Sequence, residues 1–518
     1  MDALANLALG LQVAVSPENL MYCLIGVLLG TLVGVLPGIG TTATIAMLLP
    51  ITFNLDATSA LIMLAGIYYG SQYGGSTTAI LVNIPGEISS VVTALDGYQM
   101  ARRGRAGPAL AIAAIGSFVA GCFATLVIAF AAPALAEVAL KFGPAEYFSL
   151  MVLGLISATV LAHGSVLKAI IMILVGLLIG IVGTDVNSGV LRFNFGIPEL
   201  SDGVSIIALF MGMFGIAEII ANLEHRGKRE VFTNAVKKLM PSREELRRSL
   251  GPIGRGAVVG SALGMLPGGG SILGAFSSYM VEKKMSRHPQ EFGKGAIEGV
   301  AGPEAANNAG AQASFIPMLT LGIPSNVVMA LMIGAMMIQG IAPGPQVMAE
   351  RPQLFWGMIV SMWIGNLMLV ILNLPLIGIW IKLLQVPYRL LFPSILVFMA
   401  IGVYSVNNSP FDLLIMALFG LFGIVCMKLG MEPAPLALGV VLGPLMEENL
   451  RRAMLLSRGD PLVFLERPIS AGFIIASALL LLLLSLPALR KKREEVFSEE
   501  SPEEPRDISR RTSAQQPT

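Results

Sequence analysis

The sequence is short of charge. Asp, Glu, Lys and Arg make up 13% of its 518 residues, whereas the apolar set reaches 55%. Soluble domains carry roughly 25% charged residues, and a globule of this length needs a polar surface that this composition cannot supply. Because the apolar segments are long runs rather than alternating strands of about ten residues, the composition predicts an all-α polytopic membrane protein.

Other scarce residues exclude several kinds of function. The three cysteines occur singly and the three histidines have no ligand spacing, so neither a disulfide framework nor a structural metal site is expected. A net charge of +1 gives no sign of nucleic-acid binding. No Ser-His-Asp, HExxH or Walker pattern occurs. We therefore expect a protein that is not an enzyme, has no cofactor, and takes energy for uphill work from an ion gradient.

The basic residues gather in a few places, which predict the topology. Clusters lie at 102–105, 226–255, 283–294 and 490–493, and the positive-inside rule assigns them to the cytoplasm. The apolar stretch 254–281 then starts and ends on one side, is too short to cross twice, and contains a Pro-Gly-Gly-Gly-Ser break. It is predicted to be a re-entrant hairpin of two half-helices.

Similar short sequence motifs recur at a nearly constant residue offset, which indicates an internal duplication. Residues 34–41 read GVLPGIGT, and residues 264–271 read GMLPGGGS. Ile-Pro and Gly-Pro pairs follow in the same order in both halves. Because the first hairpin has no flanking Lys or Arg, the halves are predicted to be inverted. Two opposed hairpins suggest an elevator-like carrier.

The predicted organisation has five parts. They are a first inverted repeat over 1–225 (hairpin 19–52, broken helix 57–84), a basic cytoplasmic linker over 226–253, a second inverted repeat over 254–447 (hairpin 254–281, broken helix 299–324), an outer loop and extra transmembrane helix over 448–489, and a disordered cytoplasmic tail over 490–518. Short interfacial helices are expected near 87–101 and 326–340.

Four segments are predicted to be unwound near the membrane midplane, two at the hairpin tips and two in the broken helices. Glycine lets backbone approach a ligand, Ser, Thr and Asn add neutral donors and acceptors, and half-helix N-termini suit a carboxylate. A sodium ion near the tips is also expected, with ligands unassigned. The alternative is that these glycines serve helix packing. The candidate residues are Gly38, Gly40, Thr41, Thr42, Gly74, Gly75, Ser76, Thr77, Thr78, Gly268, Gly269, Gly270, Ser271, Glu304, Asn307 and Asn308.

Three acidic residues interrupt or border apolar segments. Glu304 lies in an otherwise apolar crossing, and either belongs to a cation or proton site or lies in water near the cytoplasmic end. Glu218 is expected at the membrane interface, and Glu87 faces either the cavity or the cytoplasm, with the cytoplasm favoured.

Long stretches resemble the large membrane subunit of tripartite tricarboxylate transporters, the TctA family. They are GVLPGIGTTATIAMLLP (34–50), AGIYYGSQYGGSTTAILVNIPGE (65–87), VTALDGYQMARRGRAG (92–107) and GPEAANNAGAQASFIPMLTLGIP (302–324). The resemblance implies a multi-pass permease of the bacterial inner membrane, and the placement of the basic residues predicts a periplasmic N-terminus and a cytoplasmic C-terminus. It also implies two partners, a small TctB-like membrane subunit and a periplasmic TctC-like substrate-binding protein.

The resemblance further implies import of di- or tricarboxylates such as citrate, driven by a Na⁺ or proton gradient. One departure concerns Ser325 and Asn326, where the family often has Gly-Ser-Ala after the second Ile-Pro. If this segment contacts ligand, the substrate differs from citrate. A self-sufficient ion-coupled carboxylate carrier remains an alternative, as does a channel or an intramembrane enzyme.

Overall fold

A computed structural model describes residues 3–36, 40–161, 165–185, 188–224, 239–266, 270–384 and 388–485. These residues are almost entirely helical; strands β1 (Gly183–Thr184) and β2 (Leu191–Arg192) form a short antiparallel pair. Four helices are long and apolar enough to cross a membrane. The prediction of an all-α membrane protein is therefore confirmed.

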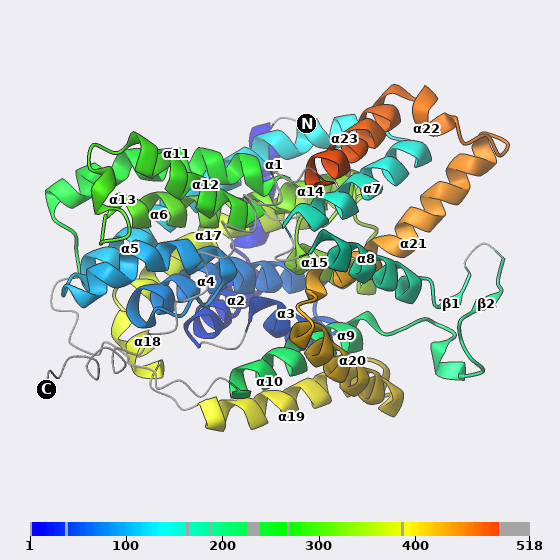
Figure 1. Ribbon diagram of the computed structural model, residues 1–518, viewed down its shortest axis with the longest axis horizontal. Coiled ribbons are helices and arrows are strands. Elements are labelled where there is room, and N and C mark those ends of the chain that lie inside the picture. The colour runs from blue at the N-terminus through cyan, green and yellow to red at the C-terminus, as the bar shows by residue number, and fades with distance from the viewer. Residues whose placement is uncertain are drawn as a thin grey trace, which may run out of the picture.

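The helices follow one another in the order shown in Figure 1. The first half contains α1 (Ala3–Ala14), α2 (Pro17–Val35), α3 (Thr41–Thr52), α4 (Ala57–Val82), η1 (Ile88–Ser90), α5 (Val91–Arg102), α6 (Ala106–Ala139), α7 (Pro144–Leu161), α8 (Val166–Gly180), η2 (Pro198–Leu200), α9 (Ile206–Phe210), the π-helical η3 (Met211–Ile216) and α10 (Ala217–Glu224). The second half contains α11 (Arg243–Gly264), α12 (Gly270–Met285), η4 (Pro289–Glu291), α13 (Glu298–Ala313), α14 (Phe315–Leu321), α15 (Val327–Ile338), α16 (Gln346–Glu350), α17 (Pro352–Asn373), α18 (Ile377–Leu383), α19 (Tyr388–Asn407), α20 (Pro410–Lys428), α21 (Pro433–Leu456), α22 (Val463–Glu466) and α23 (Pro468–Ser485).

Two pairs of helices at the centre pack through glycine. A Cβ atom on Gly30 of α2 would lie 2.4 Å from the carbonyl oxygen of Ile67 in α4, and one on Gly260 of α11 would lie 2.2 Å from that of Ala306 in α13. Only glycine permits such close backbone approach. The same contact repeats at four-residue spacing along each pair: Gly26, Gly30 and Gly34 face Met63, Ile67 and Ser71, while Gly256, Gly260 and Gly264 face Gly302, Ala306 and Gly310.

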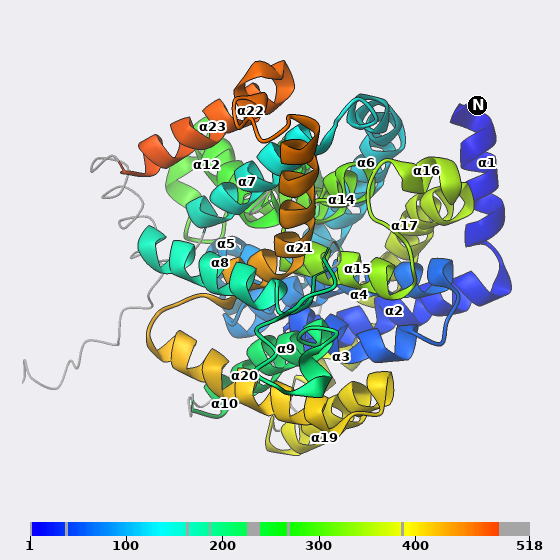
Figure 2. The ribbon, with the colours of Figure 1, turned by 90° about the vertical axis from the view of Figure 1, so that its right-hand side faces the viewer.

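Two groups of helices flank this centre, and each contains segments from both halves of the chain. In one group α8 and α7 pack against α21, and α23 packs against α7. In the other, α20 and α19 pack against η3, and α19 also contacts α3. Figures 1 and 2 show the second group along the lower edge of the molecule, with α21 and α23 above it.

The helix breaks predicted for the two hairpins are present, but the helix pairs differ. One break separates α2 from α3 and the other separates α11 from α12. α11 and α12 pack together and both cover α13, whereas α3 turns from α2 toward α15, α19 and η3. α11 also begins at Arg243, so residues 243–253 of the predicted linker belong to a helix. The rest of the predicted linker up to residue 238 and the predicted tail lie outside the described residues.

The prediction of unwound segments in the broken helices is wrong. α4 is one continuous α-helix that includes residues 73–78, and α13 is helical over 303–308. The second element is interrupted later, at Ser314, between α13 and α14. Glycine-rich sequence in these helices serves close packing instead: a Cβ atom on Gly74 would lie 2.4 Å from the carbonyl oxygen of Thr31.

The two segments predicted to be interfacial are also largely enclosed by protein. α5 buries Val92, Thr93, Asp96 and Met100, and it packs against α4, α6 and α13. α15 is buried from Val328 through Met336. Both helices therefore contribute to the interior, because neighbouring helices of both halves cover them.

Ion pairs accompany the basic residues that follow residue 447. Arg451 pairs with Asp185 at 2.9 Å and with Glu447 at 2.7 Å, and Arg467 pairs with Glu146 at 2.5 Å. These ion pairs therefore connect α21 and the segment before α23 to the part of the chain between α7 and α9.

Candidate functional site

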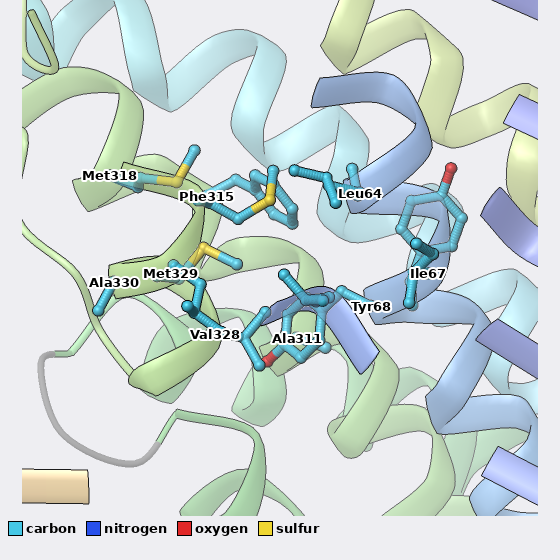
Figure 3. Close-up of a cluster of buried hydrophobic side chains, with 14 of the residues drawn as sticks. Leu64, Ile67, Tyr68, Ala311, Phe315, Met318, Val328, Met329 and Ala330 are labelled. Carbon is cyan, nitrogen blue, oxygen red and sulfur yellow. The ribbon is translucent and has the colours of Figure 1, made fainter. Parts of the chain in front are cut away.

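The second helix break meets α4 at Tyr68. The Tyr68 hydroxyl accepts a hydrogen bond from Asn326 Nδ2 at 3.1 Å and hydrogen-bonds with the side chains of Ser271 and Ser314. Its ring packs beside Phe315, with ring centroids 6.2 Å apart. Figure 3 shows Tyr68 among apolar side chains of the second half. One residue of the first half thus contacts the start of α12 and the segment before α15.

The segment before α15 is held in a fixed turn. Asn326 Oδ1 accepts the backbone N–H of Met329 at 2.9 Å and caps α15, while Ser325 Oγ donates to the Ser314 carbonyl at 3.3 Å. Gly322 ends α14 with φ +69°, which favours glycine. Ser325 therefore contacts the helix interruption at Ser314, and Asn326 shares Tyr68 as a partner with Ser271 of the second tip.

The first tip contains two carboxyl groups. The backbone N–H of Gly40 donates to Glu218, and that of Thr41 donates to Glu87, which also hydrogen-bonds with Ser71. Helix α3 begins here, so these acids take the donors that were expected to bind a substrate carboxylate. In this structure Glu218 and Glu87 both belong to the tip of α3, because α10 and the loop after α4 converge on it.

Some polar atoms at the first tip have no protein partner. The Thr41 hydroxyl and Glu87 Oε1 are buried without a hydrogen bond among the described residues. Glu218 lies at the start of α10, directly after the π-helical η3. It borders a small cavity that α3, α10 and α19 line. Such π-segments are frequent at functional sites.

Glu304 of α13 is completely buried. Its carboxylate accepts hydrogen bonds from Ser76 Oγ at 2.5 Å and from the Thr93 hydroxyl. The interpretation of Glu304 as a solvated residue at the cytoplasmic end is therefore wrong for this structure. α4, α5 and α13 bring the three side chains together.

Asn307 and Asn308 lie on the same face of α13 as Glu304 and are also fully buried. Asn308 Nδ2 donates to Ser117 Oγ at 2.6 Å, whereas Asn308 Oδ1 and both amide atoms of Asn307 have no partner among the described residues. Buried polar groups are usually satisfied, so these atoms call for a physical explanation.

Several predicted site residues make contacts between or within helices. The Thr78 hydroxyl donates to the carbonyls of Gly75 and Gly34, and Gly270 packs against Gly264. The Thr77 hydroxyl donates to the Tyr73 carbonyl at 3.3 Å. Thr42, half-buried, follows the first tip. Gly38, Gly268 and Gly269 lie outside the described residues.

Sequence reasoning missed several polar residues. Tyr68, Thr93 and Gln312 lie in stretches that resemble the TctA family but were not singled out as site residues, and Asn366 lies in an apolar segment. Only the spacing of Gln312, eight residues after Glu304 on the same helical face, offered a signal. Within the described residues no group of three His, Cys, Asp or Glu could hold a metal ion.

Together the fold and these polar groups define a multi-pass helical membrane protein with buried polar sites at and near its helix breaks. The family model for "Tripartite tricarboxylate transporter TctA family" matches residues 20–438, so the chain belongs to that transporter family. This confirms the resemblance seen in the sequence. The family comprises the large membrane subunits of tripartite transporters.

Two curated relatives come from Agrobacterium vitis. An uncharacterized 52.8 kDa protein in the TAR-I ttuC' 3' region is 60% identical over 500 residues, covering 96% of this chain and all of the relative. An uncharacterized protein in the TAR-II ttuC' 3' region is 60% identical over 241 residues, covering 46% of this chain and all of the relative. No solved structure matches the chain.

Proposed function

We propose that this chain is the large permease subunit of a binding-protein-dependent secondary transporter that imports di- or tricarboxylates. A Na⁺ or proton gradient drives uptake across the bacterial inner membrane. The partners are a small TctB-like membrane subunit and a periplasmic TctC-like binding protein. Membership of the TctA family supports this proposal, and the observation that carries it is the cluster of neutral polar groups that Tyr68 forms with Ser271 of the second break and Asn326 before α15.

The substrate site of this proposal lies between the tips. Tyr68, Ser271 and Asn326 offer neutral hydroxyl and amide groups, which suit the oxygen atoms of a carboxylate. At the first tip, Glu87 and Glu218 hold the backbone donors of α3. A substrate carboxylate therefore binds through the second tip first, and reaches the α3 N–H groups only when these acids move away.

The proposal includes two inverted repeats. The glycine contacts of α2 with α4 have counterparts in those of α11 with α13, and the packing of α8 on α21 has its counterpart in α20 on η3. These matched contacts support the duplication. Elevator-like movement of the tip-bearing centre against the flanking groups follows as a hypothesis, and cysteine crosslinks between the tips and α7 or α8 during transport test it.

Uptake by proteoliposomes tests the function. The purified chain and its partners are reconstituted, and labelled citrate and smaller dicarboxylates are supplied under an imposed Na⁺ or pH gradient. We expect gradient-driven uptake that needs the binding protein, with a roughly tenfold higher KM for Asn326→Ala, about the value of one or two lost hydrogen bonds. Gly254→Ala is the control, since its Cβ would meet no atom within 4 Å.

Other outcomes favour the alternatives. Gradient-driven uptake without the binding protein indicates a self-sufficient carrier, and flux that ignores the gradient indicates a channel. Sidedness is tested separately: Met240→Cys should label from the cytoplasm and Asn194→Cys from the periplasm. The reverse labelling pattern would contradict the proposed orientation.

A further inference from the structure

Buried carboxylates in this protein fall into two kinds. Glu282 is paired with Arg255 and Glu298 with Arg248, so a guanidinium balances each charge. Glu304 is buried more completely, yet the described residues provide only the hydroxyls of Ser76 and Thr93 as partners. A bare carboxylate in such an environment is costly, so a positive charge or a proton must balance it.

The neighbours of Glu304 discriminate between these two possibilities. A proton neutralises the carboxyl group but leaves Asn307 Oδ1 and Asn308 Oδ1 buried without a partner. A cation bound beside Glu304 gives these amide oxygens a role, because carboxylate, amide carbonyl and hydroxyl oxygens are the ligands of hard cations. Glu304, Asn307 and Asn308 are spaced i, i+3 and i+4 along α13, so their side chains lie on one helical face, where one ion could contact more than one of them.

The charge balance selects a monovalent ion. Glu304 supplies one negative charge, which one sodium ion balances, whereas a divalent ion would leave a net charge in a buried site. The other ionisable groups on the surrounding helices are already engaged. Asp96 of α5 accepts the N–H groups of Gly295 and Ala296, and Tyr73 of α4 donates toward Asn366 at 3.5 Å. Glu282 of α12 is held by its arginine.

We propose that Glu304, Asn307 and Asn308 form a sodium-binding centre, completed by the hydroxyl of Ser76 and distinct from the carboxylate site at the tips. The centre deepens the proposed function, because it is the site of the coupling ion. Helix α4 contacts both sites: Ser76 reaches Glu304, and Tyr68 reaches the second tip. Sodium binding therefore fixes the helix that also holds the substrate site.

Sodium itself is the probe in the first test. The purified full-length chain in lipid nanodiscs is melted in NaCl and in KCl at equal ionic strength. Sodium at about 100 times its Kd should raise the unfolding midpoint by several degrees relative to potassium. Glu304→Gln should lose this difference. Glu298→Gln is the matched control, since Glu298 is a buried acid of the same helix that already has an arginine partner, and it should keep the difference.

Carbodiimide labelling tests the wild-type chain, so it does not depend on a variant that folds. Dicyclohexylcarbodiimide reacts with protonated carboxyl groups in apolar surroundings, and peptide mass spectrometry locates the adduct. Sodium, but not potassium, should reduce labelling of Glu304 at least fivefold. Labelling of Glu304 that falls with rising pH and ignores sodium would overturn the proposal and indicate a proton site. A sodium-dependent shift that survives in Glu304→Gln would also overturn it.

These assays use neither partners nor a carboxylate. A failure of the sodium centre is therefore distinguishable from a failure of the proposed transport function. Sodium binding with no carboxylate uptake would contradict only the proposed substrate, and carboxylate uptake with no sodium response would contradict only this centre.

Discussion

The two tips have nearly the same sequence but different surroundings. After the second tip, α12 folds back along α11 and both helices cover α13. After the first tip, α3 leaves α2 and packs against α15, α19 and η3. The first helix of each pair nevertheless makes the same glycine contacts with the helix behind it. The tips are thus alike up to the break and different beyond it.

The residues after each break explain the difference. α12 carries Gly274, whose Cβ would lie 3.3 Å from the Cα of Gly260, and Glu282, which pairs with Arg255 of α11 at 2.5 Å. α3 contains no glycine and no charged side chain between Thr41 and Thr52. Close packing and an ion pair therefore join the arms of the second pair, whereas α3 buries its apolar residues against other helices. The comparison teaches that a Pro-Gly break does not by itself make a hairpin.

The largest expected effect comes from the glycine contacts that α2 makes with α4 and α11 makes with α13. Gly30→Val and Gly260→Val would each drive a side chain into a backbone carbonyl, and each should cost about 3 kcal/mol or more and abolish most folded protein. Yield and thermal stability of the detergent-purified chain measure this. Gly254→Ala, on an open face of α11, should behave as wild type. Tolerance of valine at only one position would show that the two glycine contacts are not equivalent.

A smaller effect is expected from the ion pair between Arg255 and Glu282, which joins the two helices of the second pair. Arg255→Met leaves Glu282, which is 1% exposed, without its partner, and should cost about 2–3 kcal/mol. The cost is below that of a fully buried pair because the Arg255 side chain is 39% exposed. Hydrogen exchange of α12 should rise toward that of α3. Unchanged α12 exchange would show that glycine packing alone holds the pair.

The contact between Tyr68 of α4 and Asn326, before α15, should contribute less to stability. Tyr68→Phe removes a hydroxyl that contacts Asn326, and should cost about 1 kcal/mol. A double-mutant cycle with Asn326→Ala should give a coupling energy of similar size, measured by thermal unfolding. Strictly additive effects would contradict a direct contact between these side chains.

The smallest effect is expected at the ion pair between Arg248 of α11 and Glu291, which is exposed to solvent. A hydrogen bond from Arg248 lowers the pKa of Glu291, so this pair stabilises the fold above the usual glutamate range and loses its contribution as pH falls through the lowered value. Glu291→Gln should cost at most about 0.5 kcal/mol, because solvent screens the pair. Melting between pH 7 and pH 3 compares the variant with wild type. A larger cost at pH 7 that persists in 1 M salt would argue against screening.

Sequence reasoning anticipated the helix breaks because proline and clustered glycines are incompatible with a continuous helix. It also singled out Ser76 and Glu304, whose side chains hydrogen-bond to each other in the structure. It misjudged α4, where Gly74 and Gly75 resemble a break but serve contact with α2 and the loop at Gly86. A glycine signals close approach or unwinding, and the residues that approach it lie far away in the chain.

The acids at the first tip show the same limit. Glu218 and Glu87 follow apolar segments, so hydropathy placed Glu218 at the membrane interface and favoured the cytoplasm for Glu87. In the structure both accept backbone N–H groups at the start of α3. Their position depends on how α10 and the loop after α4 fold back toward the tip, which no local pattern encodes.

The sequence by itself therefore determined the helical membrane class, the positions of the two breaks and the transporter family. These follow from composition, backbone restrictions of proline and glycine, and long shared motifs. Only the tertiary structure decided which helix covers each break and which side chains meet there. Tyr68 reaches the second tip, and Ser76 and Thr93 reach Glu304, because helices distant in the chain pack together. Such contacts are set by the complementarity of whole helix surfaces.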